Sequence, residues 1–419
     1  MKIAVIGSGI SGLTSAHYLS AHHDVSVFEA NKRIGGHTAT MDVELGTRRY
    51  AIDTGFIVFN DWTYPNFIAL LDELGVASAP TEMGFSVADP ETGLEYSGTS
   101  LNTLFAQRSN LFSASFIKMV RDILRFNRES VAELDSGVLD NEETLGGYLA
   151  RHGYGEKFTR QYLAAMGSAI WSSDATTVLD FPLVFFLQFF KNHGLLSVAN
   201  RPQWRVITGG SREYLAPLCA RFSERIYTDT AIASVRRSAA GVTLQLQDGR
   251  ALQFDQVVIA THSDQALRIL EEPTAAETEV LSSIPYQAND VVLHTDTRML
   301  PKNRKTWSSW NYMLGGAEQR SVVTYNMNIL QGINAPETFC VTLNNTDEIN
   351  PHRILGHFTY DHPVFSRESL AAQHRWGEIN GVSNTWYCGA YWHNGFHEDG
   401  VVSALRVVNS IENSQRAAA

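Results

Sequence analysis

Residues 2–29 read KIAVIGSGISGLTSAHYLSAHHDVSVFE, and this stretch decides the fold of the N-terminal part of the chain. Residues 2–7 form an apolar run that is typical of a strand buried on both faces, and residues 11–22 have the apolar spacing of a helix. Residues 24–29 repeat the strand pattern. A strand, a helix and a second strand within about 30 residues form a βαβ unit. The stretch therefore predicts a parallel sheet in an α/β fold.

The turn between the first strand and the helix carries the glycine motif G-x-G-x-x-G at residues 7–12. Gly7 permits the tight turn, Gly9 lets the backbone approach a pyrophosphate, and Gly12 allows the helix to pack closely. The free N–H groups at the start of the helix favour a phosphate ligand. Glu29 ends the second strand, where an acid accepts hydrogen bonds from ribose hydroxyls and repels a 2′-phosphate. The motif predicts a dinucleotide site, and by itself it does not choose between NAD and FAD.

The residues that follow Glu29 favour FAD over NAD because of a resemblance to known proteins. Residues 29–38, EANKRIGGHT, resemble the E-x-x-x-x-x-G-G-x-x segment of flavoproteins in the amine oxidase and phytoene desaturase superfamily. In that family the glycine pair, here Gly35 and Gly36, lies near the pyrophosphate, and the residue at Arg33 helps to neutralise it. Many members have arginine where this chain has His37, so an arginine contact is either lost or made by Arg33 alone. The resemblance implies FAD.

Later segments extend the resemblance. Residues 53–60, DTGFIVFN, look like the family's D-x-G-x motif beside the flavin ring. Residues 227–235 resemble the strand whose apolar residue, here Ile232, contacts the adenine, and residues 257–261 resemble the strand that returns to the cofactor sheet. Near the C-terminus, residues 386–401 resemble a strand and glycine followed by an acid, a glycine and a helix start, whose N–H groups would face the flavin carbonyl edge.

The glycine turn and the resemblance together imply a set of residues that lie beside the cofactor. The set is Gly7, Gly9, Ile10, Ser11, Gly12, Glu29, Ala30, Arg33, Gly35, Gly36, His37, Thr38, Gly55, Phe56, Ile57, Val58, Ile232, Thr261, Gly389, Ala390, Gly400 and Val401. No cysteine stands where covalently flavinylated members have theirs, because Cys388 lies inside a predicted strand. The resemblance therefore implies non-covalent FAD.

The implied fold is α/β, with a Rossmann-type FAD-binding domain of the glutathione reductase and amine oxidase kind. Residues 1–65, 204–265 and 380–414 form this FAD-binding domain. Residues 66–203, which include a helical insert, and residues 266–379 form a discontinuous α+β substrate domain. The chain is long enough for two domains of ordinary size.

Two departures from the family pattern bear on the reaction. Amine oxidases of this superfamily have a lysine on the strand that faces flavin N5, and the matching residues 284–292, IPYQANDVV, contain none. By its spacing to Gly400, His397 falls where a tyrosine of the amine-binding cage would lie, with Tyr391 close by. A histidine there could act as acid or base, since its ordinary pKa of about 6.5 is near working pH. We take His397 and Tyr391 as candidate catalytic residues; the alternative is that His397 is a polar loop residue near the cofactor.

Aromatic residues dominate the segments outside the cofactor motifs and favour an apolar, lipid-like substrate. The candidate substrate contacts are Phe181, Phe185, Phe189, Trp307, Trp310 and Trp392. The alternative is that these residues are core packing.

The leading hypothesis is an FAD-dependent desaturase, dehydrogenase or oxidase that transfers a hydride from an apolar substrate to flavin N5. Its alternatives are an amine oxidase, which the missing lysine disfavours, a redox-neutral flavin-dependent isomerase, and a flavoprotein that binds a partner without catalysis.

Composition limits the partners. The formal net charge of −11, without a basic stripe, argues against nucleic acid. Three dispersed cysteines suggest neither disulfides nor a metal site, and they fit a reducing compartment. The longest apolar run, residues 179–190, is too short for a membrane span, and the chain starts with a strand pattern rather than a secretory signal. We expect a cytoplasmic protein with a small apolar substrate, and we leave open peripheral membrane contact and the oligomeric state.

Overall fold

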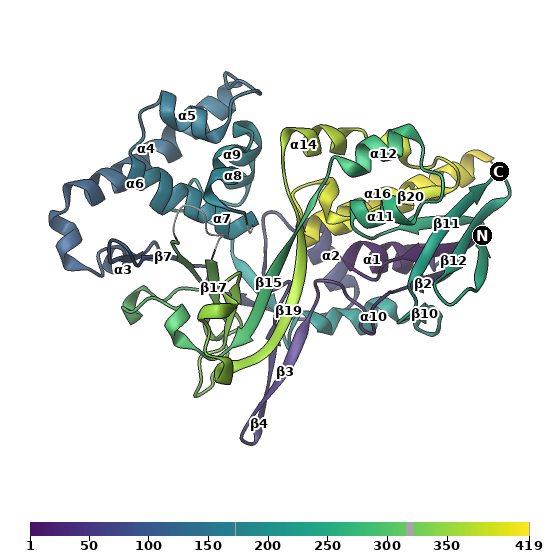
Figure 1. The fold of residues 1–419 in the computed structure, drawn as a ribbon, viewed down its shortest axis with the longest axis horizontal. Helices are drawn as coiled ribbons and strands as arrows, with labels where there is room; N and C mark the ends of the chain where they lie inside the picture. Colours follow the sequence, from purple (N-terminus) through teal and green to yellow (C-terminus); the bar gives the residue numbers. More distant parts are fainter. Residues whose placement is uncertain (172, 316–321, 419) are drawn as a thin grey trace.

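The structure is a computed structural model, and it describes residues 1–171, 173–315 and 322–418. A five-stranded parallel sheet has the strand order β10-β2-β1-β14-β20 (Figure 1). Its strands are β1 (Lys2–Ile6), β2 (Asp24–Phe28), β10 (Ile226–Tyr227), β14 (Gln256–Ile259) and β20 (Thr385–Tyr387). The predicted α/β fold is confirmed, because β1 pairs in parallel with a strand on each side.

Two helices from opposite ends of the chain pack together beside this sheet. They are α1 (Ile10–Leu19) and α16 (His397–Ala418). Buried apolar residues recur every three or four positions in both, as the helical repeat requires when one face meets the core. Helix α16 begins at His397, earlier than the start predicted near Gly400. The first turn of α16 therefore consists of residues 397–400, most of which the sequence places before the helix.

A seven-stranded sheet forms the second layer, with the order β19-β15-β18-β17-β16-β7-β8. Its strands are β7 (Phe85–Asp89), β8 (Leu94–Ser97), β15 (Tyr286–His294), β16 (Trp310–Met313), β17 (Val322–Asn326), β18 (Cys340–Leu343) and β19 (Ile354–Pro363). Only the β16–β7 pair among these described strands is parallel. The long strands β15 and β19 pair at one edge of this sheet, and they lie on its side nearer the first sheet (Figure 1).

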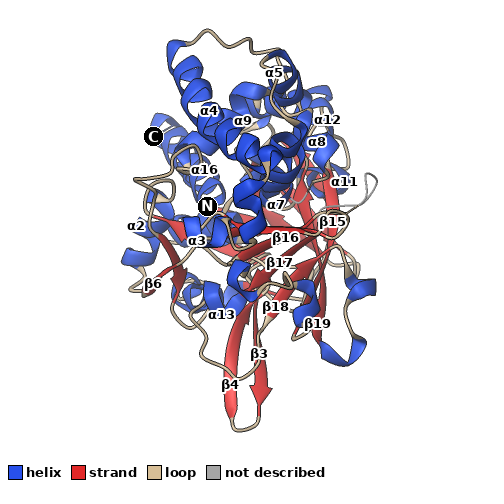
Figure 2. Cartoon of the chain, turned by 90° about the vertical axis from the view of Figure 1, so that its left-hand side faces the viewer, coloured by secondary structure: helices blue, strands red, loops and turns tan. Residues whose placement is uncertain are grey.

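A helical layer covers the second sheet, and Figure 2 shows these helices above the strands. Its members are α3 (Leu101–Leu104), α4 (Ala114–Ser136), α5 (Leu145–Arg151), α6 (Glu156–Phe158), α7 (Ala165–Trp171), α8 (Ala175–Leu179) and α9 (Leu183–Asn192). In α4, Phe116, Met119 and Phe126 are buried on one face. Ser113 caps its start, and Gly137 ends it in a left-handed conformation with φ of 69°.

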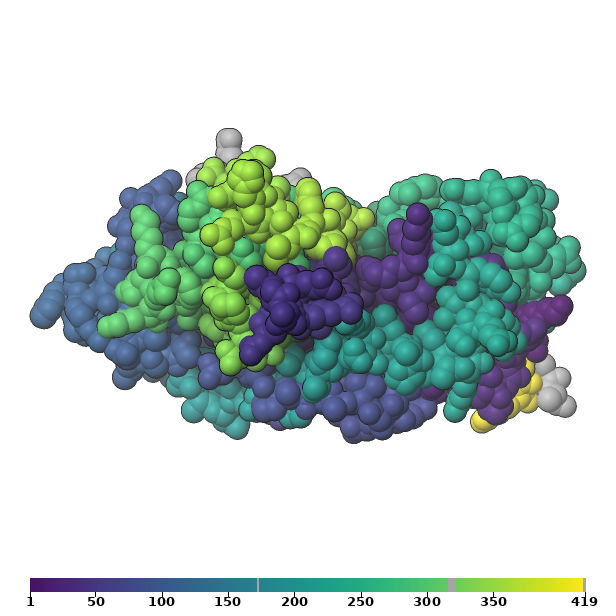
Figure 3. Space-filling view, turned by 90° about the horizontal axis from the view of Figure 1, so that it is seen from below, coloured from purple at the N-terminus to yellow at the C-terminus, as the bar shows by residue number. Residues whose placement is uncertain are grey.

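Smaller elements complete the fold. The hairpin of β3 (Thr40–Leu45) and β4 (Arg48–Asp53) projects from the lower side of the molecule (Figures 1 and 3). Two three-stranded sheets are formed by β5 (Phe59–Asn60), β6 (Ser78–Thr81) and β9 (Trp204–Ile207), and by β11 (Ile232–Ser238), β12 (Gly241–Leu246) and β13 (Ala251–Phe254). The other helices are α2 (Pro65–Glu73), α10 (Leu215–Cys219), α11 (Ser263–Ile269), α12 (Ala275–Ser282), α13 (Met327–Leu330), α14 (Arg367–His374) and α15 (Trp376–Ile379). Within the described ranges, none of the helices has the length and apolar character needed to cross a bilayer.

A buried ion pair ties the first sheet to its flanking elements. Arg237 of β11 is bonded to the carboxylate of Glu277 in α12, and both side chains are almost fully buried. The hydroxyl of Tyr387 in β20 donates to the same carboxylate at 2.6 Å. Removing one partner of a buried pair leaves an uncompensated charge, which is far more costly than losing a surface pair.

We therefore predict that Arg237→Met lowers the free energy of unfolding by about 3–5 kcal/mol, since Glu277 would stay buried without its cation. The neighbouring Arg236→Met is the matched control, because Arg236 forms its pair with Glu271 at the surface and its loss should leave the free energy of unfolding almost unchanged. Denaturant unfolding followed by circular dichroism measures both. Equal effects of the two substitutions would contradict the argument.

Candidate functional site

A cavity of about 1380 Å³ runs from the glycine turn to the helical layer. It brings together most of the residues predicted from the cofactor motifs and both candidate catalytic residues. These are Gly7, Gly9, Ile10, Ser11, Glu29, Ala30, Arg33, Gly35, Gly36, His37, Gly55, Phe56, Ile57, Val58, Ile232, Thr261, Gly389, Ala390, Tyr391 and His397. Segments far apart in the sequence thus meet on one wall.

The glycine turn is shaped by close contacts on one side and open space on the other. Gly7 has φ of +103°, and a Cβ there would lie 2.8 Å from the carbonyl oxygen of Ala260. A Cβ on Gly9, in contrast, would meet nothing within 4 Å. Gly9 precedes helix α1 and offers no side-chain cap, so the first N–H groups of α1 face the cavity side without a side-chain partner there. This arrangement suits an anionic group placed over Gly9.

The acid at the end of β2 is held rigidly. The Glu29 carboxylate accepts hydrogen bonds from the backbone and hydroxyl of Ser8 at 3.0 and 2.6 Å, and from the backbone and side chain of Asn31 at 2.9 Å. It is buried yet lines the cavity. A fixed carboxylate next to an open helix N-terminus fits the ribose and the diphosphate of a dinucleotide. The residues present therefore fit FAD.

Arg33 and His37 lie at the two positions where many members of the family have a basic residue near the pyrophosphate. The Arg33 guanidinium donates to the carbonyl oxygens of Thr38 at 2.6 Å and Gly36 at 2.8 Å, so it braces the loop around the glycine pair. Burial, together with neighbouring histidines and Arg33, holds the pKa of His37 well below its usual value. His37 is therefore neutral at neutral pH and does not replace the family's arginine as a cation.

A cluster of rings surrounds His37, and the sequence motifs did not predict it. Tyr360 and His362 of β19 lie with their ring centroids 5.1 and 5.5 Å from that of His37. His262 stacks on Tyr286 of β15 at 4.1 Å. Tyr286 belongs to the stretch 284–292, where the family pattern draws attention to lysine alone. All of these residues line the cavity.

His397 lies at the cavity wall as a neutral ring. Its imidazole stacks on Phe56 with centroids 3.5 Å apart, and Nε2 lies 3.0 Å from Thr38 Oγ1 and 3.2 Å from the Tyr214 hydroxyl. Burial lowers the pKa of His397 to about 3. A proton on this ring is therefore unfavourable at neutral pH, and the role of His397 as a catalytic acid or base stays a prediction. His397 begins a helix and is not a loop residue.

The Tyr391 hydroxyl is buried, and it has no hydrogen-bond partner among the described residues. Its ring lies on the cavity wall. An unsatisfied buried hydroxyl costs about 1–3 kcal/mol. Because this hydroxyl is fully covered, it does not reach the cavity surface, and the catalytic role of Tyr391 stays a prediction.

Four of the predicted cofactor residues lie behind the cavity wall: Gly12, Thr38, Gly400 and Val401. A Cβ on Gly400 would lie 2.7 Å from Ile10 Cγ2, so this glycine lets α16 pack on the start of α1. Because α16 begins at His397, residues 394–397 form the wall where Gly400 and Val401 were expected. The Thr38 hydroxyl forms hydrogen bonds with the Tyr214 hydroxyl and with His397 Nε2.

The predicted substrate residues are divided between wall and core. Phe189 and Trp310 line the cavity. Phe181 and Phe185 instead pack on Trp171, with centroids 5.1 and 5.9 Å apart. Trp392 is buried in the core beside the first sheet and does not line the cavity. These three residues therefore pack away from the cavity wall, and their role as substrate contacts stays a prediction.

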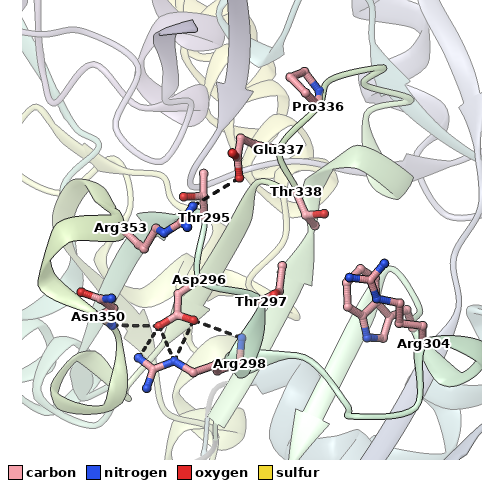
Figure 4. A pocket seen from close by; sticks show the side chains of 11 residues that line it. Thr295, Asp296, Thr297, Arg298, Arg304, Pro336, Glu337, Thr338, Asn350 and Arg353 are labelled. Atoms are coloured by element: carbon pink, nitrogen blue, oxygen red, sulfur yellow. Dashed lines mark hydrogen bonds and ion pairs between the residues drawn. The ribbon is translucent and has the colours of Figure 1, made fainter.

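Trp307 lines a separate polar pocket of about 470 Å³ (Figure 4). Arg298 in this pocket is bound to Asp296, and the Arg304 guanidinium lies over the Trp307 ring at 5.2 Å. Trp307 therefore does not line the main cavity, and its role as a substrate contact stays a prediction. A tryptophan beside charged side chains in sequence is a poor sign of an apolar wall.

The far end of the cavity is apolar and is built by the helical layer. Its lining residues include Leu101, Leu104, Val120, Ile123, Leu124, Tyr162, Met166, Ile170, Trp171, Phe189, Leu195 and Val198. None of the lining residues is a cysteine, and the three described cysteines are free and buried.

Comparisons with known proteins agree with this architecture. Among solved structures, the chain is similar to a cyclohexylamine oxidase from Brevibacterium oxydans IH-35A, with a TM-score of 0.70 and 16% identity over 99% of both chains. It is also similar to a fatty acid isomerase from P. acnes, with a TM-score of 0.69 and 15% identity over 97% of this chain and 98% of that one. Likeness at such low identity shows the fold, which is that of FAD-dependent oxidoreductases.

The family model of flavin containing amine oxidoreductases matches residues 10–335, and the chain belongs to this family. The predicted superfamily and its flavin cofactor are thereby confirmed. A putative flavin-containing monoamine oxidase, AofH of Mycobacterium tuberculosis (strain ATCC 25618 / H37Rv), is 25% identical over 60% of this chain and 55% of its own length. An L-amino-acid oxidase of Siganus canaliculatus is 23% identical over 70% of this chain and 56% of its own. The chain thus spans little more than half the length of the curated relatives it matches.

We predict that Gly9→Val folds but lowers FAD affinity by about 100-fold or more, because the new side chain occupies the open space over the turn. The control is Gly377→Val, which also adds a side chain into open space but lies outside the cavity. Flavin absorbance of the purified proteins and the unfolding midpoints of their FAD-free forms are compared. Full flavin content in Gly9→Val would overturn the placement of the diphosphate.

We predict that His397→Asn leaves the shape of the pH profile of flavin reduction unchanged between about pH 5 and 9, since the wild-type imidazole stays neutral there. Stopped-flow absorbance over this range gives the profile. Loss of a limb near pH 6–7 in the variant would show that the histidine titrates during catalysis after all.

Proposed function

We propose that this protein is an FAD-dependent dehydrogenase, desaturase or oxidase that removes a hydride from the hydrocarbon part of a lipid-like substrate. Residues 1–65, 204–265 and 380–414 hold the cofactor, and residues 66–203 and 266–379 hold the substrate. The observation that supports this proposal is the continuity of the cavity from the glycine turn to an apolar wall built by the helical layer.

The size of the cavity supports two ligands. Pockets for one small molecule usually measure about 300–1,000 Å³. The cavity of about 1380 Å³ exceeds this range. A dinucleotide over the glycine turn would therefore leave the apolar end free for a second molecule.

The charges on the wall favour a hydrocarbon over an amine. Glu29 and Asp361 are the acidic residues among the described lining, and Glu29 belongs to the glycine-turn end. Asp361 lies 3.9 Å from the imidazole of His262, away from the helical layer. A protonated amine at the helical end would lose its water without gaining a carboxylate partner. An uncharged chain loses nothing there and gains apolar burial.

Within this proposal, the chain's own residues bind and orient. The start of α1 and the Glu29 carboxylate hold the cofactor, which when bound supplies the hydride acceptor at flavin N5. Ile123, Ile170 and Trp171 exclude water from the substrate end, where a dry wall protects a reactive carbon. A lipid substrate resides in membranes, so the proposal includes a peripheral membrane contact.

A redox-neutral isomerase is the second candidate. The observation that favours it is the likeness in fold to a solved fatty acid isomerase. The two candidates differ in the mass of the product, since a dehydrogenase removes two hydrogen atoms and an isomerase removes none.

The test of the proposal is anaerobic mixing of the FAD-loaded protein with a panel of fatty acids, phospholipids and primary amines. We expect flavin bleaching with a lipid, and mass spectrometry should find a product lighter by two hydrogens. Bleaching by amines alone would replace the proposal with amine oxidation. A product of unchanged mass would favour the isomerase.

We predict that Ile123→Glu lowers the kcat/KM of flavin reduction by lipid about tenfold or more while FAD stays bound, because a charged group in the apolar wall costs at least about 1.4 kcal/mol. Val138→Glu is the control, since Val138 is exposed and lies outside the cavity. Equal kcat/KM for the two variants would place the substrate elsewhere.

A further inference from the structure

Exposed apolar side chains gather where the helical layer forms the end of the molecule. We define the apolar rim as Leu101, Leu111, Phe112, Leu124 and Val198. Phe112 is 91% exposed, Leu101 is 77% and Val198 is 70% exposed. Single exposed apolar residues are ordinary, but large ones grouped on one surface mark an interaction site.

Local contacts hold the parts of this rim together. The short 3-10 helix Arg108–Phe112 follows α3, and the Arg108 guanidinium donates to Asn102 Oδ1 at 2.6 Å and to the Phe105 carbonyl oxygen at 2.9 Å. The ring of Phe105 packs on Phe116 of α4 at 5.6 Å. Figure 1 shows α3 and the start of α4 at the left-hand end of the molecule, opposite the two termini. Exposed Phe112 is thus presented by a braced segment.

The rim is also the edge of the cavity. Leu101, Leu124 and Val198 are each more than half exposed, and each lines the cavity. A side chain can be exposed to solvent and also line a cavity only where that cavity opens at the surface. An apolar molecule that enters here meets aliphatic side chains first and the glycine turn last.

Segment 101–129, which contains four of the five rim residues, has a net charge opposite in sign to that of the whole chain. Residues 101–129 contain five cations, Arg108, Lys118, Arg121, Arg125 and Arg128, and two acids, Asp122 and Glu129, which gives a local charge of +3. The whole chain has a formal charge of −11. Both acids are paired, Asp122 with Lys118 at 2.6 Å and Glu129 with Arg128 at 3.3 Å. Arg201 adds an exposed cation at the cavity edge.

We propose that the apolar rim docks on the surface of a membrane that contains anionic phospholipid, with Phe112, Leu111 and Leu101 among the acyl chains. The exposed cations of segment 101–129, which are Arg108, Lys118, Arg121 and Arg128, face the headgroups. Apolar residues beside cations are the combination that interfacial membrane binding requires, since burial and headgroup attraction add. This inference rests on the proposed function, because it names the source from which a lipid substrate enters the cavity.

The experiment is flotation of the FAD-loaded protein with vesicles of phosphatidylcholine and phosphatidylglycerol, and with vesicles of phosphatidylcholine alone. We expect binding that is stronger to the anionic vesicles and falls as salt is added. The double variant Leu111→Ser/Phe112→Ser should bind about tenfold less, or weaker still, and Leu101→Ser should also bind less. The control is Val138→Ser/Leu355→Ser, which removes exposed apolar residues outside the rim and should bind as wild type.

Flavin content and the unfolding midpoint are checked for each variant, and these exposed substitutions should change neither. Equal vesicle binding by the rim variant and wild type would overturn the proposal. So would a wild-type dimer in solution that the rim variant dissociates, combined with no vesicle binding, since the rim would then meet a second copy of the chain.

Vesicle binding tests the membrane contact of the rim, and flavin bleaching tests the proposed function, so the two can fail separately. Vesicle binding needs no turnover, and flavin bleaching by a lipid dissolved in detergent needs no vesicle. If the substrate is not a lipid but the rim docks, vesicle binding persists without bleaching. If the substrate is a lipid but the rim does not dock, detergent-dissolved lipid bleaches the flavin and vesicle binding is absent.

Discussion

The structure depends on how closely α1 can approach β1 and β14, and α16 can approach α1, at the glycine turn. Gly7 lies against the Ala260 carbonyl, Gly12 packs against the turn itself, and Gly400 leaves room for Ile10. Side chains at these positions would push the two helices away from the sheet. Of these four glycines, Gly9 alone has open space above it, so close packing on one side leaves the start of α1 uncovered on the other. The cofactor end of the cavity follows from this asymmetry.

The same constraint orients the substrate end. The chain leaves the first sheet and returns to it several times, so β15 and β19 extend from the cofactor side into the second sheet. The ring cluster of His37, His262 and His362 forms where these strands meet the glycine-pair loop. Beyond it, α4 and α7 close the cavity with aliphatic and aromatic side chains. Polarity therefore falls along the cavity from the glycine turn to the apolar rim.

The βαβ unit and most cofactor residues could be predicted because glycine spacing and buried strands are local signals. The start of α16 at His397, ahead of Gly400, could not be predicted, since it accompanies the packing of His397 on Phe56 and of Gly400 on α1. Aromatic content alone could not separate Phe189 on the wall from Phe181 in the core, because both lie in one apolar segment. The pocket that Trp307 lines could not be predicted, since it is formed by residues distant in sequence. The ring cluster likewise needs three distant segments, so no single motif reveals it.

The central claim is that one continuous cavity holds a flavin dinucleotide over Gly9 and an acyl chain between α4 and α7. A crystal structure of the FAD-loaded protein soaked with a long-chain fatty acid tests it most directly. The account predicts diphosphate density over residues 9–11 and chain density beside Ile123 and Ile170, leading toward Leu101. Acyl density elsewhere, or a dinucleotide that extends into the helical end and fills it, would contradict the claim.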